Sequence, residues 1–211
     1  MKNTSPLLVR PHTSDVSVFR QIYIDESLGS VKRLRTKPKK ILDLGAYTGI
    51  STRWLADTFP SSLVVGIEPH PALMELARTN APNAALVRIA VGAESAWVEV
   101  HEDDDRGDWA THTRESDVEG VAKVRQLTMS QIVGTLEYDV VKLDVEGAEK
   151  AVFEGDLGWL ESVQLLLVET HDRFVPGCTE AMYSALSRCG RKWTELKRRG
   201  SSADHAIRFT S

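Results

Sequence analysis

Two apolar runs of this sequence, 138–143 and 163–168, are each followed at once by side chains that can exchange protons or bind cations. These side chains are Asp144 after the first run, and Glu169, His171 and Asp172 after the second. An imidazole has an ordinary pKa of about 6.5, so His171 is predicted to act as a general base, oriented by Glu169, while Asp144 faces the reacting centre. Two alternatives stay open: the carboxylates cap the following backbone, or these side chains share a divalent cation such as magnesium.

A buried strand that ends in a glycine turn is a second segment that could bind a ligand. Gly45 and Gly49 are spaced as GxxxG, unlike the GxGxxG that holds a dinucleotide pyrophosphate. The turn is therefore expected to hold a different ligand. Asp43 could bind water or an ammonium group, and the following helix N-terminus, with Ser51 and Thr52 nearby, favours a carboxylate. Tight packing of strand and helix is the alternative explanation of the glycines.

A further carboxylate, Glu68, follows the second apolar run. It lies roughly twenty residues past the glycine turn, where a carboxylate accepts hydrogen bonds from both ribose hydroxyls in nucleotide-binding folds. Pro69 then turns the chain away from the sheet. By the same topology, Ala90 and Val91 at the end of the third run are expected to line a nucleobase pocket, with simple burial as the alternative.

These side chains depend for their positions on five short apolar runs, which are typical of strands covered on both faces. The runs are 40–44, 63–67, 85–91, 138–143 and 163–168. Stretches that can form helices lie between or after them, at 51–58, 71–79, 129–133, 148–153 and 179–188. This alternation predicts an α/β fold with a parallel sheet, whose strands end at one edge where ligands bind.

Some segments depart from that alternation. Residues 96–101 alternate apolar and polar side chains and predict an extra strand, paired with 122–127 across an acidic loop at 102–119 that is either unstructured or a lid. The segment 192–209 predicts two strands around a turn. Ahead of the sheet, residues 15–34 have the spacing of one or two helices.

The composition fits a single domain, because 211 residues can bury a core without disulfides. We divide it into an N-terminal helical segment, 1–38, that packs on or caps the site, and a core domain, 39–211. A net charge of -4 makes nucleic acid an unexpected partner. Cys178 and Cys189 have no partners at zinc spacing, and no long apolar run or signal peptide is evident, so a cytoplasmic protein without membrane association is expected.

The motifs together resemble those of the FkbM-type methyltransferases. They are Thr13-Ser14-Asp15-Val16 with Phe19, Asp43-Leu44-Gly45-Ala46-Tyr47-Thr48-Gly49, Glu68-Pro69-His70-Pro71, Lys142-Leu143-Asp144-Val145-Glu146-Gly147-Ala148-Glu149, Val168-Glu169-Thr170-His171-Asp172 and Pro176-Gly177. The resemblance spans residues 13–190. The block beginning at Lys142 is its most specific part, because the glycine turn would fit many methyltransferases.

This resemblance implies a Rossmann-like class I methyltransferase fold: a mostly parallel seven-stranded sheet with a C-terminal antiparallel hairpin and helices on both faces. It also implies S-adenosylmethionine (SAM) as methyl donor and an oxygen acceptor on a small molecule, such as a sugar, a polyketide or a carboxylic acid. The residues expected to bind SAM are Asp43, Gly45, Ala46, Tyr47, Gly49, Ser51, Thr52, Glu68, Pro69, Ala90, Val91 and Asp144. Tyr47 departs from the asparagine common in the family, which leaves the contacts to the methionine end of SAM open.

Several alternatives remain at this point. A hydroxyl acceptor would need a base or a metal, whereas a carboxylate acceptor would need only positioning. His112, in the polar loop that could roof the site, is a candidate second base or substrate contact. A non-catalytic nucleoside-binding domain and an NAD-dependent reductase are competing functions, although the reductase would call for a GxGxxG turn. The oligomeric state is open, with a homodimer as one alternative.

Overall fold

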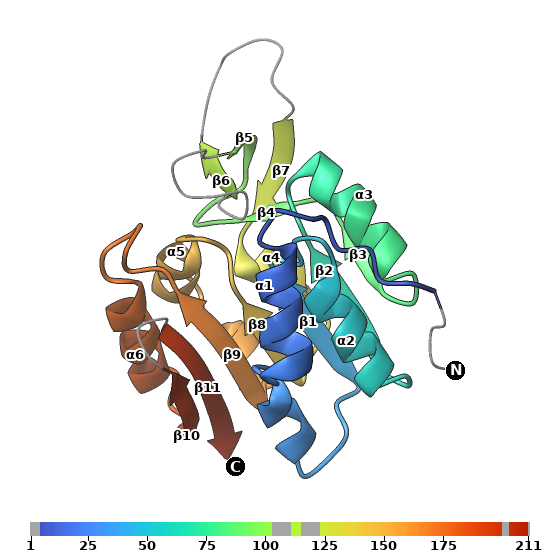
Figure 1. Cartoon of the computed structure of the whole chain (residues 1–211). Coiled ribbons are helices and arrows are strands. Elements are labelled where there is room, and N and C mark those ends of the chain that lie inside the picture. The colour runs from blue at the N-terminus through green and yellow to red at the C-terminus, as the bar shows by residue number, and fades with distance from the viewer. Residues whose placement is uncertain (1–4, 103–110, 115–122, 200–202, 211) are drawn as a thin grey trace.

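The apolar runs build the parallel part of a seven-stranded sheet (Figure 1). The computed structural model describes residues 5–102, 111–114, 123–199 and 203–210. Within them, five strands pair in parallel in the order β3-β2-β1-β8-β9. They are β1 (Lys40–Leu44), β2 (Leu63–Ile67), β3 (Ala85–Val87), β8 (Val140–Leu143) and β9 (Leu165–Thr170). All four residues of β8 are buried, as expected for a strand covered on both faces.

An antiparallel hairpin completes the sheet. It consists of β10 (Lys192–Arg199) and β11 (Ala203–Thr210). β11 lies between β9 and β10 and pairs antiparallel with both. The predicted seven-stranded sheet with its C-terminal hairpin is therefore confirmed.

Helices cover both faces, as predicted, because neighbouring strand residues point to opposite sides. Leu166 packs in one hydrophobic cluster with Phe153 and Met182, and Leu165 packs in the other with Leu55. The helices are α2 (Ile50–Thr58), α3 (Pro71–Asn80), α4 (Met129–Val133), α5 (Glu149–Glu154), α6 (Cys178–Arg188) and the 3-10 turn η3 (Gly158–Glu161). In the parts of the chain that are described, no helix has the length and apolar character needed to cross a membrane.

The N-terminal segment forms two helical stretches, as predicted: a continuous one at 15–24 that changes from α to π geometry, and a 3-10 turn at 29–33. The first consists of α1 (Asp15–Phe19) and the π-helical turn η1 (Arg20–Ile24), and the second is the 3-10 turn η2 (Gly29–Arg33). Ile22, Leu28 and Val31 pack with Ile41 and Val140 of the sheet. The segment thus lies across the face of β1 and β8 (Figure 1).

The expected third strand, 85–91, is divided between two sheets. Ile89 N–H donates to the carbonyl of Val87 in a tight turn, which redirects the chain. The last two residues form β4 (Ala90–Val91) in a four-stranded sheet of order β4-β7-β5-β6. Its other strands are β5 (Ala96–Glu102), β6 (Thr111–Arg114) and β7 (Lys123–Leu127).

The predicted pairing across the acidic loop is confirmed, because β5 and β7 are antiparallel with Ala96 opposite Gln126. β6 was not expected from the sequence. Most of the rest of the predicted loop, 103–110 and 115–119, lies outside the described residues, as do 120–122 and the side chain of His112. The idea of a lid therefore stays a prediction.

Candidate active site

A pocket of about 660 Å³ lies at the carboxyl ends of the central strands. It is lined by Gly45 after β1, Glu68 after β2, Asp144 after β8 and Glu169 near the end of β9. Ser14, Ser17, Val18, Gln21 and Leu28 of the N-terminal segment form another wall. The volume is that of a typical small-molecule site, and the edge of the sheet is where α/β folds bind ligands.

The two glycines of the β1–α2 turn make room for the protein's own backbone. Gly45 has φ +80°, and a Cβ there would lie 1.7 Å from the carbonyl oxygen of Asp144. Gly49 also has φ +80°, and a Cβ there would lie 2.8 Å from Cα of Ala77 in α3. Gly45 still lines the pocket together with Ala46, but Gly49 does not. The contact with α3 therefore explains the glycine at position 49 by close packing of the protein backbone.

Asp43 is fully buried and does not line the pocket. Its Oδ2 accepts hydrogen bonds from Ser51 Oγ at 2.7 Å and Thr52 Oγ1 at 2.6 Å. Its Oδ1 lies 3.2 Å from Nζ of Lys142. The carboxylate is thus bound by protein groups and positions α2 and Lys142, and a ligand contact of Asp43 or Thr52 stays a prediction. Ser51 does reach the pocket wall.

Glu68 lies on the pocket wall with its carboxylate held by backbone. Oε2 accepts from Tyr47 N–H at 2.9 Å, and Oε1 accepts from His70 N–H at 2.8 Å. Burial raises the pKa of Glu68 to about 7, against the effect of these two hydrogen bonds. Pro69, Ala90 and Val91 line the same region, next to Ile67, Leu73 and Ile89.

Tyr47 connects the glycine turn to the N-terminal segment. Its hydroxyl accepts from Arg10 Nη2 at 2.6 Å and lies 2.8 Å from Ser14 Oγ. Arg10 in turn forms an ion pair with buried Asp15, 2.8 Å away. Burial raises the pKa of Tyr47 to about 12, so the hydroxyl stays protonated. The tyrosine therefore attaches one pocket wall to another.

Lys142 is a pocket residue to which the sequence analysis assigned no role. Its Nζ lies 3.2 Å from Asp43 Oδ1 and 3.2 Å from Asp144 Oδ2, and it donates to the carbonyl of Gly45 at 3.1 Å. Burial alone would lower the pKa of Lys142, but the charges of Asp144 and Asp43 hold it above its ordinary value. The ammonium group thus fixes the end of β8 to the glycine turn.

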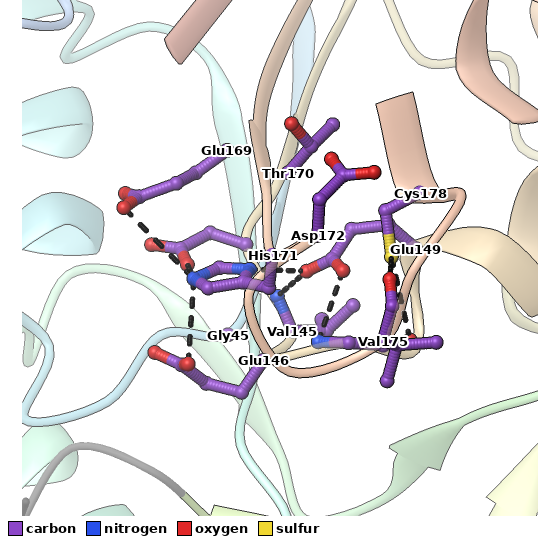
Figure 2. Close-up of polar contacts among 12 residues, drawn as sticks. Gly45, Val145, Glu146, Glu149, Glu169, Thr170, His171, Asp172, Val175 and Cys178 are labelled. Carbon is purple, nitrogen blue, oxygen red and sulfur yellow. Dashed lines mark hydrogen bonds and ion pairs between the residues drawn. The ribbon is translucent and has the colours of Figure 1, made fainter. Parts of the chain in front are cut away.

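His171 is oriented by Glu149, not by Glu169 as expected. The imidazole Nδ1 lies 2.9 Å from Glu149 Oε1, and a carboxylate can only accept here, so Nδ1 carries the proton. Glu149 is fully buried and also accepts from the N–H groups of Val145 and Gly147, each at 2.9 Å. Figure 2 shows the carboxylate of Glu149 beside the imidazole. Glu149 is part of the Lys142–Glu149 motif, but from the sequence it was interpreted only as an acidic residue favoured by the dipole at the start of a helix.

Three carboxylates face the other imidazole nitrogen (Figure 2). His171 Nε2 lies 3.3 Å from Glu146 Oε2, 3.8 Å from Asp144 Oδ1 and 3.9 Å from Glu169 Oε1. Glu146, which the sequence also explained as a helix-opening residue, lines the pocket with Asp144 and Glu169. His171 itself is only 2% exposed and lies behind them.

The carboxylates shift the acid–base properties of the cluster. Burial alone would lower the pKa of His171, but the hydrogen bond to Glu149 and the negative charges around it raise the pKa to about 9. The charge of Asp144, followed by burial, raises the pKa of Glu169 to about 8. A protonated imidazole cannot take a proton, so His171 could act as a general base only after losing the proton on Nε2, and that role stays a prediction.

Asp172, included in the alternative cation set, points away from this cluster. Its Oδ1 accepts from Gly177 N–H at 3.1 Å, and its Oδ2 accepts from Thr179 N–H at 3.1 Å. Burial alone would raise the pKa of Asp172, but the hydrogen bond from the Thr179 hydroxyl, followed by these two backbone bonds, holds it below its ordinary value. Asp172 therefore caps the start of α6.

The Methyltransferase FkbM domain matches residues 43–192 of this sequence. The chain belongs to the FkbM methyltransferase family. Its fold resembles that of methyltransferase FkbM from Methylobacillus flagellatus KT, with a TM-score of 0.58 and 17% identity over 96% of this chain and 48% of that one. The chain thus spans about half the length of this FkbM relative.

Two other proteins are informative neighbours. The ribosomal protein L11 methylase from Lactobacillus delbrueckii subsp. bulgaricus shares the fold with a TM-score of 0.50 and 14% identity, over 88% of this chain and 77% of that chain. The malonyl-[acyl-carrier protein] O-methyltransferase of Halorhodospira halophila is 32% identical over 68 residues, which cover 32% of this chain and 23% of that protein. These neighbours differ in what they methylate. The family and the fold therefore do not identify the methyl acceptor, which has to be inferred from the residues of the pocket.

Proposed function

We propose that this FkbM-family protein is a SAM-dependent O-methyltransferase acting on a hydroxyl of a small molecule. The observation that carries the proposal is that one pocket joins Glu68, after β2, to Asp144 and Glu169, at the ends of β8 and β9. A nucleoside-binding carboxylate and a set of groups suited to an acceptor oxygen then share one cavity.

The residues around Glu68 fit the adenosyl part of SAM. Each oxygen of Glu68 accepts one backbone N–H and keeps a lone pair, so the carboxylate can accept from two ribose hydroxyls. The apolar side chains of Leu73, Ile89 and Val91 offer a slot for a flat base. The N-terminus of α2, next to Ser51, favours a carboxylate.

The groups at the β8 and β9 ends suit the acceptor. SAM, when bound, supplies a methyl carbon whose bond to sulfur breaks, with the electron pair returning to sulfur, as the acceptor oxygen forms its new bond to that carbon. Asp144 and Glu169 line the pocket and can orient a hydroxyl, and Asp144 can receive its proton. Lys142 holds Asp144 in position, and His171, which lies behind the pocket wall, faces both Asp144 and Glu169.

The charge of this end favours a hydroxyl acceptor over a carboxylate. Asp144, Glu146, Glu169 and Asp204 all line the pocket. The buried cation among the lining residues, Lys142, already contacts Asp43 and Asp144, and the exposed lining cation, Arg173, lies close enough to act on Glu146 by its charge. A carboxylate acceptor would meet several like charges, which disfavour binding.

Calorimetric titration with S-adenosylhomocysteine and with NAD tests the nucleoside site. We expect S-adenosylhomocysteine to bind and Glu68→Gln to weaken it by at least about tenfold, since a buried charge-assisted hydrogen bond contributes about 1.5–3 kcal/mol. Glu75→Gln, at an exposed position of α3, should bind like the wild type. Tighter binding of NAD than of S-adenosylhomocysteine would overturn the proposal.

Transfer of a labelled methyl group tests the acceptor. Panels of small polyols and of small carboxylic acids should be offered separately, with S-adenosylhomocysteine formation as a second readout. We expect product only with hydroxyl acceptors. Methyl ester formation without ether formation would contradict the assignment of the acceptor while leaving SAM binding intact.

A further inference from the structure

We propose that Asp144, Glu169 and His171 form a binding site for one divalent cation, with Glu146 beside it. One oxygen of each carboxylate and Nε2 of the imidazole all lie within 4.8 Å of one another. The site itself does not depend on SAM, although its use in catalysis rests on the function proposed above.

The spacing of the ligand atoms suits a cation at their centre. Magnesium holds its ligands at about 2.1 Å, which places neighbouring ligands about 3.0 Å apart and opposite ligands about 4.2 Å apart. His171 Nε2 lies 3.8 Å from Asp144 Oδ1 and 3.9 Å from Glu169 Oε1. These distances fall between the two values, so small side-chain movements would complete the coordination.

The imidazole is built into the site in the way that a metal ligand requires. His171 is 2% exposed, and its Nδ1 is fixed by Glu149, which is itself fixed by two backbone N–H groups. Metal-binding histidines are usually held by such a carboxylate on the other ring nitrogen. A bound cation would displace the proton from Nε2 while the proton on Nδ1 stays on the Glu149 side, and the Nε2 lone pair then points toward carboxylate oxygens.

Four carboxylates lie around His171, whereas Lys142 is the buried cation beside them and Arg173 acts on Glu146 by its charge from an exposed position. Lys142 contacts Oδ2 of Asp144, and Oδ1 is left to face His171. The guanidinium of Arg173 lies over the ring of Phe174, 4.4 Å from its centroid. Among the described residues, Glu146 Oε2 is a buried oxygen without a hydrogen bond, 3.3 Å from Nε2. A cation between these groups would satisfy the lone pair and the oxygens together.

The chemistry of the ligands favours magnesium or manganese, because two of the three donor atoms are carboxylate oxygens. Asp144 and Glu169 line the pocket, so a bound cation would keep open positions toward it. A hydroxyl bound there would have a lowered pKa, and its proton would pass to solvent or to Glu146, which stays outside the ligand set.

Titration of the protein with Mn²⁺, followed by electron paramagnetic resonance without SAM or acceptor, tests the site. We expect one saturable Mn²⁺ per chain and a weak ¹⁴N hyperfine coupling from a coordinated imidazole. Glu169→Gln should weaken binding by at least about tenfold. Glu180→Gln, which removes the same charge from an exposed position of α6, should leave binding unchanged.

His171→Gln tests the contribution of the imidazole independently of that of the carboxylates. Circular dichroism checks that each variant is folded. The variant should lose the ¹⁴N coupling. No saturable Mn²⁺ binding, binding by Glu169→Gln equal to that by Glu180→Gln, or a ¹⁴N coupling that survives in His171→Gln would overturn the cation site. Titration with S-adenosylhomocysteine in EDTA is scored separately, so a failure of SAM binding cannot be mistaken for a failure of the cation site.

Discussion

At the scale of residues, the two ends of the pocket use carboxylates differently. Glu68 is held by the backbone N–H groups of Tyr47 and His70 and keeps lone pairs for a ligand. The carboxylate of Glu149 is occupied by groups of the protein itself, because it accepts hydrogen bonds from two backbone N–H groups and from His171. The first is thus a candidate ligand contact and the second a positioning residue.

The affinity for S-adenosylhomocysteine should depend on pH through Glu68. Burial raises its pKa to about 7, and the ionised form accepts ribose hydroxyls better than the acid, so binding lowers that pKa. The affinity for S-adenosylhomocysteine should therefore reach its maximum above pH 7 and fall as the pH drops below 7. Calorimetry from pH 5.5 to about 8.5 measures this dependence. An equally steep fall in Glu68→Gln would assign the effect to another group.

Glu149→Gln should destabilise the fold. One carboxylate oxygen is replaced by an amide N–H₂, which must face a donor such as the N–H of Val145 or Gly147. An unsatisfied buried donor costs about 1–3 kcal/mol, so we expect a loss of that size in the free energy of unfolding by urea. Glu154→Gln, exposed on the same helix, should change stability by less than about 0.5 kcal/mol.

At the scale of elements, the β1–α2 turn determines how close the strands and helices approach. Gly45 lets the turn contact the backbone after β8, and Gly49 lets the start of α2 contact α3. The same turn places Tyr47 against the N-terminal segment. The glycine motif therefore organises the pocket walls mainly through protein contacts.

Gly49→Ala should be markedly more destabilising than Gly190→Ala. Both glycines have positive φ, +80° and +70°, so both variants carry the backbone strain of about 1 kcal/mol. Only at Gly49 does the new Cβ meet another backbone, 2.8 Å from Cα of Ala77, whereas nothing lies within 4 Å at Gly190. Urea unfolding should show an extra loss of at least about 1 kcal/mol for Gly49→Ala. Equal losses would remove the packing explanation.

At the scale of the whole molecule, the pocket brings together segments that are distant in the chain. Ser17 and Gln21 precede the sheet, Glu68 follows its second strand, and Asp204 belongs to the final hairpin. Ile22 and Leu28 also share a hydrophobic cluster with Leu167 and Ala206. A ligand in the pocket would therefore contact both the N-terminal segment and the sheet.

Binding of S-adenosylhomocysteine should slow hydrogen exchange in two places at once. We expect protection in the N-terminal segment, around residues 14–28, and in the turn after β2, because both line the pocket. The small sheet strand β5 serves as an internal control, since Ala96–Glu102 contributes no lining residue. Protection confined to the turn after β2 would show that the N-terminal segment takes no part in nucleoside binding.

The sequence by itself determined the alternation of strands and helices, the hairpin, the glycine turn and the carboxylates at the strand ends. These follow from local periodicity and from the rule that parallel strands end at one edge. Most of the site, including Glu68, Asp144 and Glu169, was therefore predictable from position along the chain.

Only the tertiary structure decided which groups meet. Asp43 is bound by Ser51, Thr52 and Lys142, and His171 is bound by Glu149, 22 residues away. Partners of this kind depend on side-chain direction and on the burial that makes a carboxylate bind the nearest donor, and neither quantity is encoded in spacing along the chain. For the same physical reason, the proton state of His171 followed from the charges that folding gathers around it.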